Sequence, residues 1–221
     1  MEIQKKIADI KNSIPENVTL VAVSKTKPVS DLQEAYEGGQ RVFGENKIQE
    51  MVDKFEVLPK DIQWHMIGHL QSNKVKYMAH FVNLIHGIDK FKTLKEINKQ
   101  AKKHDRVIHC LLQARIAKEE TKFGLSFEDI ESILQSSELA MLENIKIVGL
   151  MGMATFTDNE VQLIEEFTSL KNFFDTQQLK TVTKNCQLQT LSMGMSGDYN
   201  LAIANGSSMI RVGSSIFGNR N

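Results

Sequence analysis

Val18-Thr-Leu-Val-Ala-Val23, followed directly by Ser24-Lys25-Thr26-Lys27-Pro28, is the stretch that decides the fold class of this chain. Its first six residues are rich in β-branched side chains and are apolar on both faces of an extended segment. A strand of this kind is typical of parallel sheets, because helices cover both sides of such a sheet. The stretch therefore predicts a buried parallel strand that ends in polar and cationic residues.

The rest of the chain repeats this unit, since short β-branched runs alternate with longer segments of helical spacing. The predicted strands are residues 18–23, 41–43, 62–65, 81–85, 107–113, 145–150, 187–191 and 208–211. A helix over Glu2–Ser13 precedes the first strand. This pattern predicts an α/β fold with one domain over residues 1–221, a single (β/α)8 TIM-type barrel with an extra N-terminal helix. A doubly wound open sheet is the alternative, because one sequence does not give the strand order.

Local signals also predict where particular helices lie. Residues 71–79 are predicted to form a helix between the third and fourth strands. Ser126-Phe-Glu-Asp129 has the form of a capping box, so Ser126 is predicted to begin the next helix. Asp158 is predicted to cap a long helix on which Leu163 and Phe167 share one face.

Composition restricts the class of protein. The 221 residues carry 27 Lys+Arg and 27 Asp+Glu, so the net charge is zero and no basic footprint for nucleic acid is present. The chain has no apolar run of about 20 residues, and its N-terminus has no apolar segment typical of a secretory signal. Cys110 and Cys186 are far apart, which argues against a disulfide framework and a cysteine zinc site. We therefore expect a cytoplasmic protein without membrane or nucleic-acid partners.

Polar, glycine and cationic residues gather where the predicted strands end. In a (β/α)8 barrel, the carboxyl ends of the strands carry the chemistry. The stretches at these ends are 24–28, 44–46, 65–69, 86–87, 114–115, 151–153, 192–198 and 211–214. The amino ends of the strands have mostly the Pro, Lys and Asn of ordinary turns, so we expect the functional site at the carboxyl end of the barrel.

Lys25 is the strongest single candidate at that end. It closes an apolar strand, so its side chain is expected to project into the mouth of the barrel, where partial burial would lower its pKa. A lysine in this state is suited to a Schiff base with an aldehyde. The alternative is a strand-end lysine whose ammonium group extends to water.

Two further sets of residues are candidates for ligand binding. Ser192–Ser196 and Arg211–Ser214 fall on the loops after strands seven and eight, where barrels often bind phosphate through backbone N–H groups. His65 and His69 have a spacing of four, but their strand-end position makes helical geometry doubtful. We therefore expect no metal site, a packed or ring-contacting His65, and an exposed or helix-start His69.

Six motifs in this order resemble those of the pyridoxal phosphate homeostasis protein family, which is similar to the N-terminal domain of alanine racemase. They are Leu20-Val-Ala-Val-Ser-Lys-Thr-Lys-Pro28, Phe43-Gly-Glu-Asn46, Trp64-His-Met-Ile-Gly-His-Leu-Gln-Ser-Asn-Lys74, Gly149-Leu-Met-Gly-Met-Ala154, Leu191-Ser-Met-Gly-Met-Ser-Gly-Asp198 and Ile210-Arg-Val-Gly-Ser-Ser-Ile-Phe-Gly218. The resemblance implies a barrel that binds pyridoxal 5′-phosphate (PLP).

The resemblance also implies a role for each site residue. Lys25 would form the Schiff base with PLP, and Arg211 would face the pyridine nitrogen. The remaining residues would surround the phosphate or the ring: the backbone of Gly213 and Ser214 and the hydroxyls of Ser192 and Ser196 at the phosphate, with Asn46 and His65 lining the ring pocket.

Two functions fit such a barrel, a PLP carrier and an amino-acid racemase. A two-base racemase needs a second proton donor opposite Lys25, usually a tyrosine from a second domain, and the chain ends at Asn221 soon after the barrel. Of its tyrosines, only Tyr199 is predicted near the mouth. We therefore expect a monomeric, non-enzymatic protein of PLP homeostasis that delivers PLP to apo-enzymes, with a racemase-like enzyme as the alternative.

Overall fold

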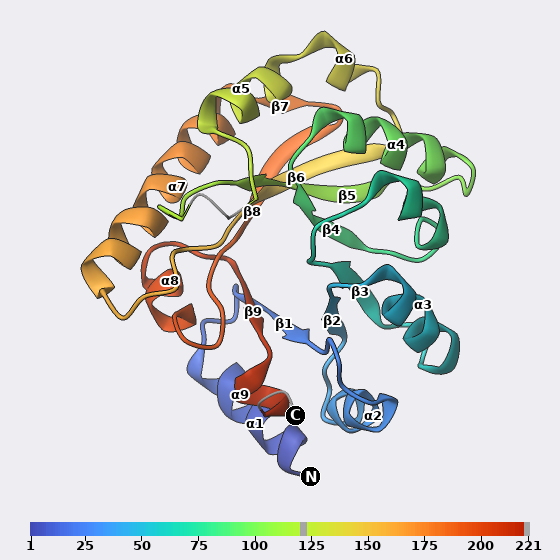
Figure 1. Cartoon of the computed structure of the whole chain (residues 1–221), viewed down its shortest axis with the longest axis vertical. Helices are drawn as coiled ribbons and strands as arrows, with labels where there is room; N and C mark the ends of the chain where they lie inside the picture. Colours follow the sequence, from blue (N-terminus) through green and yellow to red (C-terminus); the bar gives the residue numbers. More distant parts are fainter. Residues whose placement is uncertain (120–122, 219–221) are drawn as a thin grey trace.

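The computed structural model describes residues 1–119 and 123–218, and a closed ring of parallel strands forms its centre (Figure 1). Neighbouring strands pair in chain order, and the pairings of β6 with β8 and of β9 with β1 close the ring. The eight strands are β1 Thr19–Val23, β2 Val42–Glu45, β3 Gln63–Met66, β4 Leu84–Ile88, β5 Ile108–Ala114, β6 Ile145–Gly152, β8 Cys186–Ser192 and β9 Met209–Val212. The predicted barrel is confirmed, and the open-sheet alternative is excluded.

Helices surround this ring on its outside (Figure 1). The helical segments are α1 Glu2–Ser13, α2 Val29–Glu37, α3 Ile48–Val57, η1 Ser72–Tyr77, α4 Phe91–Lys102, α5 Phe127–Gln135, α6 Ser137–Ala140, α7 Glu160–Lys180, α8 Tyr199–Ala204 and α9 Ser214–Phe217. The extra N-terminal helix α1 spans the predicted residues and packs against α2 and α9. Among the described residues, no helix combines the length and apolar character needed to cross a membrane.

Two hydrophobic layers hold the barrel together. The larger layer lies between the strands and the surrounding helices and includes Leu20, Phe43 and Trp64, which are fully or almost fully buried. A smaller cluster, which we call the inner plug, fills the interior of the ring with side chains from five strands. Its members are Val21, Leu84, Leu111, Met151 and Met209. Since strand side chains alternate between faces, the residues two positions beyond the plug also face the interior, at the carboxyl end.

Several local predictions need correction. The helix predicted over residues 71–79 is the short 3₁₀ segment η1, a form that suits brief connectors with i→i+3 hydrogen bonds. Asn159, and not Asp158, caps α7, because its Oδ1 accepts a hydrogen bond from the Gln162 backbone N–H. The capping prediction for Ser126 is confirmed, since its hydroxyl accepts from the Asp129 backbone N–H.

Three short elements were absent from the sequence prediction. A two-residue strand, β7 (Val182–Thr183), pairs antiparallel with β8 at the outside of the ring. Helices α6 and α9 have only four residues each, too few to show a helical period in the sequence. Of these elements, α9 bears on function, because it follows β9 directly at the carboxyl end of the barrel.

Candidate functional site

The interior of the barrel changes from apolar to polar at the carboxyl ends of the strands. Two residues beyond Leu84 of the inner plug comes His86, and two beyond Met209 comes Arg211. The same step leads from Leu111 to Gln113. Because side chains in a strand alternate with period two, this polar layer lies directly above the plug. The apolar plug thus lies between this polar layer and the amino ends of the strands.

Four buried polar side chains, including His86 and Arg211 of this layer, form one hydrogen-bonded chain across the barrel. Arg211 Nη1 donates to Ser192 Oγ at 2.5 Å, and Ser192 Oγ lies 3.3 Å from His86 Nδ1. His86 Nε2 lies 3.1 Å from His65 Nδ1. All four side chains are at most 4% exposed. Arg211, Ser192, His86 and His65, from β9, β8, β4 and β3, are called the buried relay below.

Arginine sets the direction of the first hydrogen bond in the relay. A guanidinium only donates, so Ser192 Oγ accepts from Arg211 and keeps one proton that it can donate to His86 Nδ1. In the tautomer that accepts this proton, His86 carries its own proton on Nε2 and donates to His65 Nδ1. In that arrangement the proton of His65 is on Nε2.

Burial keeps the two imidazoles neutral. Desolvation lowers the pKa of His65 to about 3. The pKa of His86 also lies well below its ordinary value, because of desolvation and then the neighbouring His65 and Arg211. Burial lowers the pKa of Arg211 to about 10, so Arg211 remains a cation at neutral pH. Its second anchor is the Gly152 carbonyl oxygen, 2.9 Å from Nη2.

A second group of polar atoms meets where β9 leads into α9. Ser196 Oγ accepts hydrogen bonds from the backbone N–H groups of Gly213, at 3.1 Å, and Ser215, at 3.5 Å. Ser196 lies in the loop after β8, and Asp198 in that loop accepts from the Met195 backbone N–H. An oxygen atom therefore already sits where two backbone donors converge. Ser214, between these donors, is exposed.

Lys25 and Asn46 follow neighbouring strands at the same end of the barrel. Lys25 comes two residues after the end of β1 and Asn46 directly after β2, and these strands pair side by side. Lys25 is half-buried and forms the second residue of a turn in which the Lys27 N–H donates to the Ser24 carbonyl oxygen at 3.1 Å. Asn46 packs its backbone against Gly68, where an added Cβ would meet the Asn46 carbonyl oxygen at 2.5 Å.

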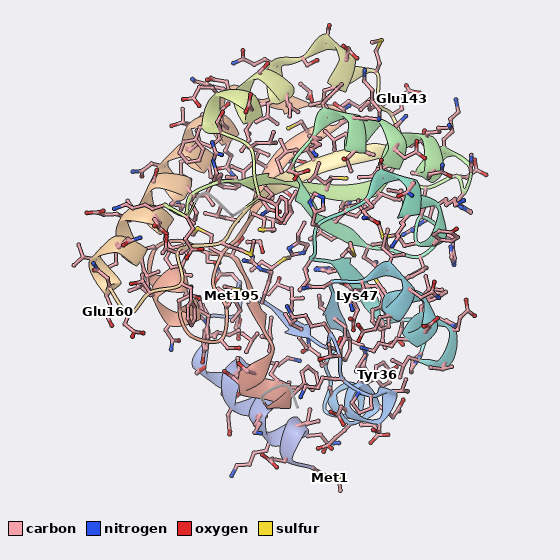
Figure 2. The ribbon with its side chains drawn as sticks, viewed as in Figure 1. Met1, Tyr36, Lys47, Glu143, Glu160 and Met195 are labelled. Atoms are coloured by element: carbon pink, nitrogen blue, oxygen red, sulfur yellow. The ribbon has the colours of Figure 1, made fainter. Side chains whose placement is uncertain are left out.

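Figure 2 shows how the loops at this end are distributed. Lys47, just before α3, and Met195, in the loop after β8, are drawn on either side of the centre of the ring. Met1, Glu143 and Glu160 lie at its periphery.

The relay brings together Arg211, Ser192 and His65. The hydrogen bond from the Gly213 backbone N–H to Ser196 Oγ brings those two residues together. Lys25 and Asn46 lie at the same end of the barrel, after the neighbouring strands β1 and β2. The sequence prediction missed His86, although the period-two step from Leu84 could have identified it. His69 is partly exposed, pairs with Asp89 at 3.3 Å and stacks on Phe123. Within residues 1–119 and 123–218, no group of three or more potential metal ligands is present.

Comparison with known sequences gives a consistent family. The model of the alanine racemase N-terminal domain matches residues 1–221. The pyridoxal phosphate homeostasis protein of Haemophilus influenzae is 38% identical over 225 residues, which cover 99% of this chain and 93% of the relative. The protein of the same name from Escherichia coli K12 is 37% identical, over 93% of this chain and 87% of the relative.

Comparison with solved structures agrees. PipY of Synechococcus elongatus PCC7942, in a structure with PLP bound, has a TM-score of 0.88 at 33% identity, over 98% of this chain and 100% of PipY. Alanine racemase of Clostridium difficile 630 has a TM-score of 0.76 at 14% identity, over 99% of this chain but 57% of the racemase, which shows the shared fold alone. The chain belongs to the family of the alanine racemase N-terminal domain, and within it to the pyridoxal phosphate homeostasis proteins.

Proposed function

We propose that this chain binds PLP at the mouth of the barrel and serves PLP homeostasis, with Lys25 as the covalent attachment point. The observation that carries the proposal is a buried, positively charged arginine at the carboxyl end of a barrel whose relatives are named for this function. The Lys25 amine would condense with the PLP aldehyde: a carbon–nitrogen double bond forms and the aldehyde oxygen leaves as water. PLP, when bound, supplies an aldehyde, an aromatic ring nitrogen and a phosphate for recognition.

The residues at the β9–α9 junction fit the phosphate group. Ser196 Oγ occupies the point where the Gly213 and Ser215 N–H groups converge, so a phosphate oxygen could replace it there. Gly213 also packs closely against β1, because an added Cβ would lie 3.2 Å from the Val23 carbonyl oxygen. Once displaced, the Ser196 hydroxyl could donate to the phosphate. We also assign phosphate binding to the backbone of Ser214.

Arg211 fits a ring nitrogen that stays unprotonated. Because a guanidinium has no acceptor, it can pair with a pyridine nitrogen only when that nitrogen offers its lone pair. The bonds of Arg211 to Ser192 and Gly152 hold it rigidly inside the barrel. An unprotonated ring withdraws electrons weakly, which favours storage of PLP over chemistry on amino acids. We place Asn46 and His65 beside the ring as lining residues.

We further propose that the protein is a carrier without turnover, cytoplasmic and monomeric, with one domain over residues 1–221, and that it delivers PLP to apo-enzymes. Incubation of the PLP-loaded protein with single L-amino acids, followed by chiral chromatography, should detect no sustained racemisation or decarboxylation. The same preparation should activate an apo-enzyme that depends on PLP. Turnover that grows with time, and that disappears in the Lys25→Ala variant, would favour the racemase-like enzyme instead.

A further inference from the structure

The backbone on both sides of Lys25 is held by a cluster of three charged side chains behind the barrel wall, of which Lys54 and Glu45 are buried and Glu50 is partly exposed. Lys54, from α3, is 4% exposed, and its Nζ donates to the Ser24 carbonyl oxygen at 2.8 Å. Glu50, one turn earlier on α3, accepts from the Thr26 backbone N–H at 2.5 Å. The two peptide groups that flank Lys25 are thus each anchored to α3. Lys54 and Glu50 also pair with each other at 2.7 Å.

Glu45 at the end of β2 completes this cluster. Its Oε1 accepts from Lys54 Nζ at 2.8 Å and from the Ser24 hydroxyl at 2.6 Å. Lys54 Nζ therefore donates to three acceptors, which satisfies an ammonium group taken out of water. Burial raises the pKa of Glu45, although Lys54 opposes the rise. A buried charge cluster is costly where its atoms lack hydrogen-bond partners, and Glu45 Oε2 has none among the described residues. The hydrogen bonds of Glu45 Oε1 and Lys54 Nζ both include an atom of Ser24, the residue before Lys25.

The turn itself needs external support. Thr26 has a φ of 66°, a left-handed conformation that β-branched residues strongly avoid. It is the third residue of the Ser24–Lys27 turn, a position at which glycine normally supplies a positive φ. Such a conformation costs about 1–3 kcal/mol and persists only where surrounding contacts enforce it. Glu50 and Lys54 provide those contacts, on the residue after Lys25 and the residue before it.

We propose that Glu50, Lys54 and Glu45 are positioning residues that hold the backbone of Lys25 in the conformation that aims its amine into the barrel. This inference rests on the proposed function of Lys25. The hydrogen bonds that these residues make within the described part of the chain join them to one another, to Ser24 and to Thr26, and to no residue of the relay. Their effect would pass through the two anchored peptide groups and the Ser24 hydroxyl.

The test compares Glu50→Ala with Glu50→Gln and with Asp175→Ala. Glutamine keeps an oxygen that can accept from the Thr26 N–H, whereas alanine removes it. Asp175 forms an i,i+4 ion pair with Lys171 on α7, so Asp175→Ala removes a comparable helix pair elsewhere. Lys54→Met is a second variant that removes the anchor on Ser24. Thermal unfolding verifies that each variant remains folded.

Two readouts are needed. The first is hydrogen exchange of the Thr26 amide in protein free of PLP, and the second is the rate at which borohydride-fixed adduct appears on Lys25 after PLP is added. We expect Glu50→Ala to lose protection of the Thr26 amide and to slow adduct formation by about tenfold or more, since a reacting group misplaced by about 1 Å can cost about a hundredfold in rate. The rate of adduct formation in Glu50→Gln should stay within about threefold of the wild-type rate, and the rate in Asp175→Ala should equal the wild-type rate.

The outcomes separate this inference from the proposed function. A Thr26 amide that exchanges freely in the wild type, or that is equally protected in Glu50→Ala and the wild type, would overturn the inference that Glu50 anchors this backbone. Lost protection of the Thr26 amide with an unchanged rate of adduct formation would show that the anchored backbone does not aim the Lys25 amine, and would also overturn the inference. A wild-type protein that forms no adduct on Lys25 would overturn the proposed function itself.

Discussion

Replacing His65 with asparagine should make the protein less sensitive to acid, although it removes a buried side chain from the relay. The asparagine Oδ1 lies close to the position of the imidazole Nδ1 and can still accept from His86 Nε2, but it cannot take up a proton. The folded protein holds His65 neutral, because desolvation lowers its pKa from the ordinary 6.5 to about 3. The unfolded chain imposes no such restriction.

The size of the effect follows from this difference in pKa. The ordinary pKa of 6.5 applies to His65 in the unfolded chain. Below that pH the unfolded chain binds a proton at residue 65 and the folded chain does not, so acid favours unfolding. Between about pH 7 and pH 5, the proton difference amounts to about 2 kcal/mol of lost stability from this group alone. The loss of stability continues as the pH falls towards about 3, the pKa of His65 in the folded protein, and it is absent well above 6.5, its pKa in the unfolded chain.

Urea unfolding at a series of pH values measures this directly. Wild type should lose about 2 kcal/mol more than His65→Asn between pH 7 and pH 5. Ser207→Ala is the control, because Ser207 is a buried residue that bonds to the backbone of β8 and β9 and does not titrate in this range. It should lower stability equally at each pH. Parallel pH profiles for wild type and His65→Asn would refute a neutral, desolvated His65.

Three other outcomes are expected. Pyridoxal should bind much more weakly than PLP in equilibrium titrations, because each hydrogen bond to a charged phosphate contributes about 1.5–3 kcal/mol; equal affinities would argue against the phosphate cradle. Ser192→Ala should lower the urea unfolding free energy by about 2–4 kcal/mol, because Arg211 and His86 each lose a buried partner, and a change below about 0.5 kcal/mol would contradict the relay. Ser126→Ala should cost about 1 kcal/mol through the lost bond to the Asp129 N–H, and an unchanged melting temperature would contradict the cap.

The barrel could be predicted from local periodicity because each strand and most helices bury a regular face. The prediction was weakest where burial does not follow from a regular element. Phe81 and Val82 suggested a strand, yet their N–H groups donate to Met78 in a turn after η1, and β4 begins only at Leu84. This shift of three residues placed His86 outside the predicted strand, which explains why its role in the relay was missed.

The anchoring of the Lys25 backbone by Glu45, Glu50 and Lys54 could not be predicted, for a different reason. The predicted second strand ends at residue 43, whereas β2 continues to Glu45, whose side chain bonds to Lys54 of α3. Its pairing with Lys54 depends on how α3 packs behind β1 and β2, which no local pattern encodes. Lys25, Arg211 and Ser192 were found because they stand at strand ends and within family motifs. Their proposed roles towards PLP are still predictions.

The central claim is that Lys25 holds PLP at the mouth of this barrel. The most direct measurement is borohydride reduction of the PLP-loaded protein, followed by peptide mapping by mass spectrometry. The account predicts a single modified lysine, Lys25, and no fixed adduct in the Lys25→Ala variant. A reduced adduct on Lys27 or another lysine, with Lys25 unmodified, would contradict it.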